Sequence, residues 1–144
     1  MLSKLFSFHA PSAKEPAPKP DERTALGALM VRVAKSDRNY KFEEISAIDR
    51  LLGRFFGLKP IEAAKLRALC EKIEANAPAT EEFAQIIRDH VDFQHRIEAH
   101  EALCEVMLAD GSATVEELEI IDRSRVALGL SEADCAAARD RVSA

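Results

Sequence analysis

Apolar residues recur at helical spacing from Asp21 to the end of the chain, and no segment alternates between apolar and polar residues as a half-buried strand does. This pattern predicts seven helices, at about residues 22–36, 41–56, 60–76, 80–91, 92–109, 114–128 and 132–142. The residues at helix ends agree with these limits, because Pro60 suits a first turn and Gly57 and Gly129 stand where helices stop. We therefore expect an all-α fold.

An internal repeat divides the helical region into two related halves. Residues 33–50 (VAKSDRNYKFEEISAIDR) align with residues 106–123 (VMLADGSATVEELEIIDR) at a constant offset of 73. Each half reads helix, short acidic loop, helix, Gly-Leu turn and helix. Two copies are too few for a solenoid, so we expect residues 21–144 to form one compact bundle of about seven helices with two pseudo-repeated halves.

The first twenty residues have a different composition. Four prolines fall within residues 11–20, which predicts a disordered, extended leader for residues 1–20. The leader starts with the apolar stretch MLSKLFSFH, which is too short for a secretory signal. Peripheral contact of this stretch with a membrane surface or a partner helix stays open, although one short segment gives weak membrane affinity.

Charge is unevenly distributed along the chain. Residues 1–72 hold 14 Lys and Arg against 9 Asp and Glu, whereas residues 73–144 hold 6 against 16, and the net charge is −5. A nucleic-acid partner is not expected, since the overall sign is wrong and only one Tyr and no Trp are present for stacking on bases. The acidic C-terminal half instead suits cations or a basic protein partner.

Cysteine usage and hydropathy bear on the compartment. The three cysteines are an odd number without a CxxC pair, which favours reduced thiols. The longest apolar stretch, residues 25–34, is interrupted by Arg32 and is far shorter than the roughly 20 residues of a membrane span. We expect a cytoplasmic protein.

The acidic loops are the strongest candidates for a functional site. A pseudo-two-fold would bring them together, and carboxylates and loop carbonyls are the ligands that Ca²⁺, Mg²⁺ and Mn²⁺ prefer. The candidate metal ligands are Asp37, Glu43, Glu44, Asp110, Glu116 and Glu117. The residue pattern by itself favours the structural interpretation, because acidic residues are common at helix starts, where each stabilises the helix dipole by ~0.3–1 kcal/mol.

Two other metal sites are rejected on spacing. Asp110, Ser112 and Thr114 imitate the first ligands of an EF-hand, but Ile121 occupies the twelfth position, where a bidentate glutamate is required. A zinc site at His100 lacks further ligands, so a buried core histidine is the favoured interpretation.

We find no nucleophile with its base and no phosphate loop, and we therefore expect no enzymatic activity.

The segments ALCEVMLADGSATVEELEIIDR, ALGLSEADCAAAR and HVDFQHRIEAHEALCEV together resemble the TerB family of tellurite-resistance proteins over residues 22–142. The resemblance implies a fold of about seven helices and a cytoplasmic role in the bacterial response to metal or chemical stress. It also implies divalent cation binding by acidic loop residues, and protein complexes near the membrane. Three residues depart from the family pattern: Arg38 replaces a glycine, and Ser112 and Thr114 stand where acidic residues are common.

The matched loop residues decide what the resemblance implies for function. Asp110, Glu116 and Glu117 match the family pattern well, while Asp37 and the glutamate pair at 43 and 44 match in position. We expect a binding module whose acidic loops take a divalent cation or a basic partner. The alternative is a protein-interaction adaptor without metal, similar to the TerB-like domains linked to co-chaperones.

Overall fold

The computed structural model describes residues 19–76 and 78–143. The described chain contains seven α-helices and no strand: α2 (Glu22–Lys35), α3 (Phe42–Phe56), α4 (Pro60–Ala75), α5 (Thr80–His90), α6 (Phe93–Leu108), α7 (Val115–Leu128) and α8 (Glu132–Ser143). Each helix begins and ends within one residue of the limits that the sequence predicts, so the all-α fold is confirmed. The predicted leader, residues 1–20, lies almost wholly outside the described residues.

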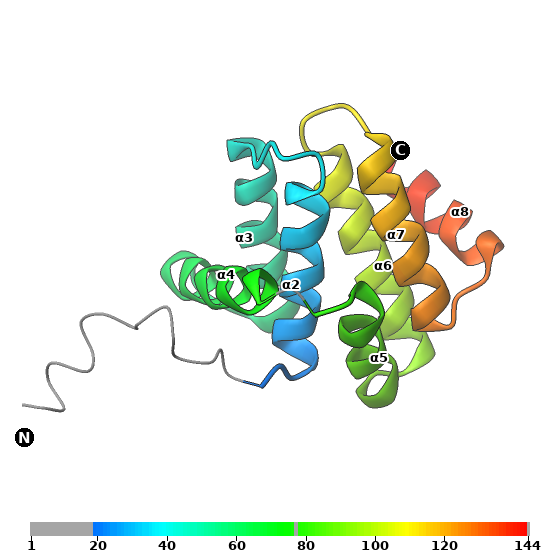
Figure 1. The fold of residues 1–144 in the computed structure, drawn as a ribbon, viewed down its shortest axis with the longest axis horizontal. Helices are drawn as coiled ribbons and strands as arrows, with labels where there is room; N and C mark the ends of the chain where they lie inside the picture. The colour runs from blue at the N-terminus through cyan, green and yellow to red at the C-terminus, as the bar shows by residue number, and fades with distance from the viewer. Residues whose placement is uncertain (1–18, 77, 144) are drawn as a thin grey trace, which may run out of the picture.

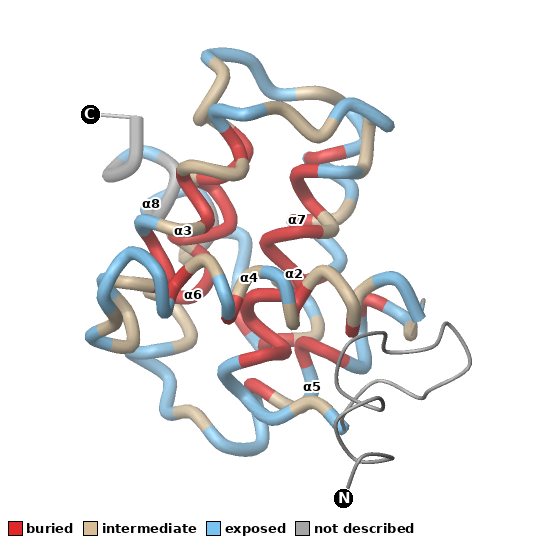
Figure 2. The backbone as a smooth tube through the Cα atoms, turned by 90° about the vertical axis from the view of Figure 1, so that its left-hand side faces the viewer, coloured by how far each residue is buried: buried red, intermediate tan, exposed pale blue. Residues whose placement is uncertain are grey.

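Helix α2 forms the centre of the core. Its residues from Thr24 to Ala34 are buried except Arg32, as the red stretch of α2 in Figure 2 shows. Gly27 lets α4 approach closely, because a methyl group at this position would overlap the Cys70 side chain. Although α2 is so apolar, no helix in the described part of the chain is both long and apolar enough to cross a membrane.

The packing of the helices follows the sequence repeat. Helix α4 packs against α2 in the first half as α8 packs against α6 in the second, and α2 and α6 contact each other. The contact of α2 with α7 has its counterpart in the contact of α6 with α3. Helix α5 packs against both α2 and α7 and so joins the two halves (Figure 1). The expected pseudo-two-fold bundle is therefore present.

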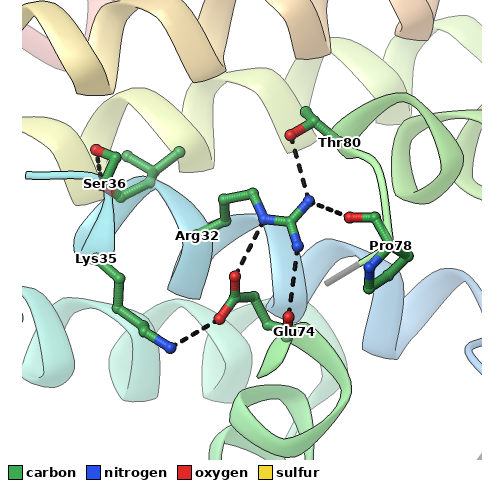
Figure 3. Close-up of polar contacts among 7 residues, drawn as sticks. Arg32, Lys35, Ser36, Glu74, Pro78 and Thr80 are labelled. Atoms are coloured by element: carbon green, nitrogen blue, oxygen red, sulfur yellow. Dashed lines mark hydrogen bonds and ion pairs between the residues drawn. The ribbon is translucent and has the colours of Figure 1, made fainter. Parts of the chain in front are cut away.

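Arg32 is the one charged residue within the apolar stretch of α2, and it fixes the junction between α4 and α5 (Figure 3). Its Nε donates to Glu74 Oε2 at 3.1 Å, and its Nη1 donates to the Pro78 carbonyl at 2.6 Å. Nη1 also lies 3.4 Å from the Thr80 hydroxyl at the start of α5. Lys35 donates to the second oxygen of Glu74 at 2.9 Å. One guanidinium thus ties three segments together.

Candidate functional site

The two acidic loops lie at the same end of the bundle, as the loops before α3 and α7 in Figure 1 show. Each loop turns through a residue in the left-handed conformation, Arg38 with φ 64° and Gly111 with φ 83°. Glycine adopts this conformation without strain, whereas a residue with a side chain is strained there. The loops therefore share a backbone geometry although only the second has the suited residue.

Glu44 and Glu117 each close the start of the helix that follows their loop. Glu44 Oε1 accepts a hydrogen bond from the Lys41 backbone N–H at 3.0 Å, and Glu117 Oε1 accepts one from the Thr114 N–H at 2.8 Å. Thr114 Oγ1 accepts in return from the Glu117 N–H at 3.1 Å, which completes a capping box. Lys41 has no acceptor on its side chain, so the first half has only half of this motif.

The same two glutamates are buried beside each other. Each residue is 1% exposed, and no hydrogen-bond donor in the described chain reaches Oε2 of either one. Burial raises the pKa of Glu44 to about 7, and the neighbouring Glu117 carboxyl contributes to the rise. A hydrogen bond between the two carboxyl groups requires that one of them keep its proton. The two Oε2 atoms therefore lack a partner, and either a shared proton or a bound cation would supply one.

Lys41 links the two loops by an ion pair. Its Nζ lies 2.7 Å from Asp110 Oδ2, and this hydrogen bond raises the pKa of Lys41 and lowers the pKa of Asp110. Asp37 and Glu44 also favour the charged form of the lysine. Asp37 itself accepts from the Asn39 N–H at 3.0 Å. An ammonium group from the first half therefore neutralises a carboxylate of the second loop.

The remaining predicted ligands, Glu43 and Glu116, face outward. Both are exposed, one residue before the buried pair in each half. Glu116 lines a surface hollow of about 340 Å³ together with Arg32, Lys35 and Glu74. The six predicted ligands thus fall into groups: the carboxylates at 44, 110 and 117 approach one another, that of Asp37 is linked to them through Lys41, and the other two point away.

The chemistry of the buried pair fits a hard cation, although the described residues include no group of three or more His, Cys, Asp or Glu side chains arranged to hold a metal ion. The Oε2 atoms of Glu44 and Glu117 are buried oxygens without a donor, which is the kind of ligand that Ca²⁺, Mg²⁺ and Mn²⁺ accept. The nearby Asp110 carboxylate is already engaged, by Lys41 at Oδ2 and by the Ser112 N–H at Oδ1.

Lys41 is the residue that sequence reasoning missed. The repeat places it opposite Thr114, so the sequence does reveal that a capping oxygen is replaced by a cation. It does not reveal that the ammonium group reaches a carboxylate 69 residues away. Such a contact depends on how the two halves pack, which periodicity within one helix leaves undefined.

Comparison with protein families matches residues 23–140 to the family described as Tellurite resistance protein TerB. This range includes all seven described helices except the first residue of α2 and the last residues of α8. No curated protein and no solved structure gives a significant match to the chain.

Proposed function

The chain belongs to the tellurite resistance protein TerB family, and we propose that it works there as a binding module for a divalent cation and not as an enzyme. The proposed setting is the cytoplasmic response of bacteria to tellurite, metal or chemical stress. The cation is Ca²⁺, Mg²⁺ or Mn²⁺, and its ligands are Glu44, Glu117 and Asp110.

One observation carries the proposal, namely the two buried carboxyl oxygens of Glu44 and Glu117 that no donor satisfies. Adjacent buried carboxylates are poorly solvated and repel each other, so the ionised pair is unfavourable by itself. A divalent cation between them neutralises two charges in one step and supplies the missing partner for both oxygens. Membership of the tellurite resistance protein TerB family supports the proposed setting in a stress response.

Lys41 sets the conditions under which the cation binds. Its ammonium group holds Asp110 at 2.7 Å, so a cation must compete with it for that carboxylate. Release of Lys41 would free the loop before α3, because this ion pair connects it to the loop before α7. Cation binding would therefore change how the two loops are held, and a partner could detect that change.

Titration with Ca²⁺, Mg²⁺, Mn²⁺ and Zn²⁺, followed by amide NMR, tests the proposal. We expect saturable shifts at residues 42–46, 109–112 and 115–119 with one of the hard cations. The double substitution Glu44→Gln with Glu117→Gln should abolish them. The matched control, Glu43→Gln with Glu116→Gln, removes the same number of charges one residue earlier and should keep them. An absence of shifts near Asp110 at millimolar metal would refute the cation site.

A second function, a protein adaptor without metal, rests on a different observation. Phe42 and Val115, the first residues of α3 and α7, are 76% and 77% exposed beside Glu43 and Glu116. Exposed apolar residues with acidic neighbours fit a partner segment that is both apolar and basic. An adaptor would capture its partner in the presence of a chelator and lose it on Glu116→Lys, whereas capture that depends on a cation would stop in chelator.

A further inference from the structure

An apolar cavity lies at the end of the bundle opposite the acidic loops, between the start of α2, the ends of α3 and α5 and the start of α6. Its volume is about 170 Å³, and only its rim is polar, formed by Glu22 and His95. The apolar lining consists of Leu26, Phe55, Phe56, Ile87, Val91 and Ala99. We propose that residues 2–8 of this chain, LSKLFSF, dock in this cavity with a leucine or phenylalanine side chain.

The size and chemistry of the cavity fit such a side chain. An apolar cavity of roughly 150 Å³ stays dry and takes up benzene, so a slightly larger one has room for a phenyl or isobutyl group. Phe55, Phe56 and Val91 remain partly exposed at its mouth, and an occupant would cover them. Burial of apolar surface on both sides would then favour docking.

The position of the cavity relative to the chain favours this occupant over others. Glu22, at the rim, is the first residue of α2, so the chain that precedes it reaches the cavity without crossing the bundle. Twelve residues, 9–20, connect residues 2–8 to Asp21, which is enough chain to turn back to a cavity beside Glu22. A tether of this length gives an effective concentration in the millimolar range, so even weak docking is populated.

Spacing and charge agree with the same assignment. Leu2, Leu5 and Phe6 are separated by three and one residues, the spacing that places side chains on one face of a helical turn. Next to the cavity lies a hollow of about 400 Å³ that shares Phe55 and His95 with it and is also lined by Arg54, Glu98 and Glu101. Lys4 lies between Leu2 and Leu5, so a docked segment would bring its ammonium group to the rim of the cavity, where Glu22 carries a negative charge.

Methyl NMR of the full chain tests the proposal with the variant Leu5→Asp with Phe6→Asp. We expect the methyl signals of Leu26, Ile87 and Val91 to shift relative to the wild-type chain, while that of Ile121 stays in place. We also expect this variant to bind an apolar fluorescent dye severalfold more strongly than the wild-type chain, because its cavity is unoccupied. The control variant, Ser3→Asp with Ser7→Asp, adds the same charge to the same segment. It should leave the methyl signals and the dye binding as they are in the wild-type chain.

Three results would overturn the proposal. The first is an identical set of cavity methyl signals in the wild-type chain and in Leu5→Asp with Phe6→Asp. The second is a shift that grows with protein concentration, which would assign the cavity to a second copy of the chain. The third is a combination of two observations. The wild-type chain sediments with phosphatidylcholine and phosphatidylserine vesicles while that variant does not, and the Ile87 methyl signal of the two chains is the same in lipid-free solution. That outcome would assign residues 2–8 to a membrane surface.

Discussion

The carboxyl groups of Glu44 and Glu117, which occupy equivalent positions 73 residues apart, meet inside the bundle and share one buried environment. Each group uses one oxygen to hold the start of its own helix and leaves the other oxygen without a donor. The local structural role and the proposed ligand role therefore belong to different oxygens of the same side chain, and the two interpretations of these glutamates are compatible.

The pH dependence of stability should reveal the buried pair. The pKa of Glu44 is about 7 in the folded chain against 4.5 for a free side chain, so the folded state binds more protons between these values. The contribution of this group to the free energy of unfolding is full below pH 4.5 and falls as pH rises to about 7. In chelator, the stability of wild type relative to Glu44→Gln should fall over this range by up to about 3 kcal/mol.

Urea denaturation at half-unit steps of pH measures this difference. The isosteric Gln keeps an oxygen for the Lys41 N–H and can donate to Glu117, so the variant should be the more stable chain at pH 8. If the stability of wild type relative to Glu44→Gln is the same at every pH from 4.5 to 7, Glu44 does not take up a proton on folding. That result would contradict the raised pKa of the buried pair.

Replacing Lys41 by Thr should strengthen cation binding. Thr supplies the capping hydroxyl that Thr114 has in the second half, and it releases Asp110 from its ion pair. We expect the Kd for the bound cation to fall by roughly tenfold, equivalent to about 1.4 kcal/mol, measured by calorimetry. Lys59→Thr is the matched control, because Lys59 also precedes a helix and donates its N–H to a glutamate three residues later. Equal effects of the two substitutions would exclude competition by Lys41.

Arg38 is the described non-glycine residue with a positive φ, 64°, and it stands where the second loop has Gly111. Arg38→Gly should therefore raise the free energy of unfolding by about 1 kcal/mol, because it removes the strain of the left-handed conformation. The urea midpoint measures the effect. Asn39→Gly, one residue later, should instead lower the midpoint, since the backbone there has no positive φ to relieve. A lower midpoint for Arg38→Gly would contradict the loop geometry.

Arg32→Lys should destabilise the fold even though it conserves the charge. Lysine has one ammonium group and cannot reach Glu74 and the Pro78 carbonyl together as the guanidinium does. Loss of these partly buried contacts should lower the free energy of unfolding by about 2–3 kcal/mol, measured by urea denaturation. Lys35→Ala removes the more exposed ion pair of Glu74 and should lower it by less than about 1 kcal/mol. Similar losses for the two variants would contradict the anchoring role of Arg32.

Much of this arrangement follows from local patterns in the sequence. Apolar periodicity and helix-end residues define each helix within one residue, since both act over a few positions. The inward position of the glutamate pair also has a local signal in the sequence. Glu44 precedes the buried Ile48 and Leu51 by four and seven residues, and Glu117 precedes the buried Ile121 and Ser124 by the same spacings, so each lies on the buried face of its helix. The residues seven positions after Glu43 and Glu116 are exposed arginines, so these two glutamates fall outside that face.

Other features depend on contacts between distant segments and have no local signal. The ion pair of Lys41 with Asp110 and the fork of Arg32 on Glu74 join residues 69 and 42 positions apart. Helical periodicity states which face of a helix is buried, but it does not state which neighbour that face meets. The internal repeat predicts the neighbour of Glu44 and Glu117 only, because a two-fold relation brings equivalent positions of the two halves together.

Paramagnetic broadening by Mn²⁺ tests the central claim most directly, since it reports which amides lie near one bound ion. If the two halves share a site, substoichiometric Mn²⁺ will broaden the amide signals of residues 42–46 and 115–119 in parallel, and Glu44→Gln with Glu117→Gln will remove the effect in both. Broadening confined to one half, or unchanged in the double variant, would contradict a cation shared between Glu44 and Glu117.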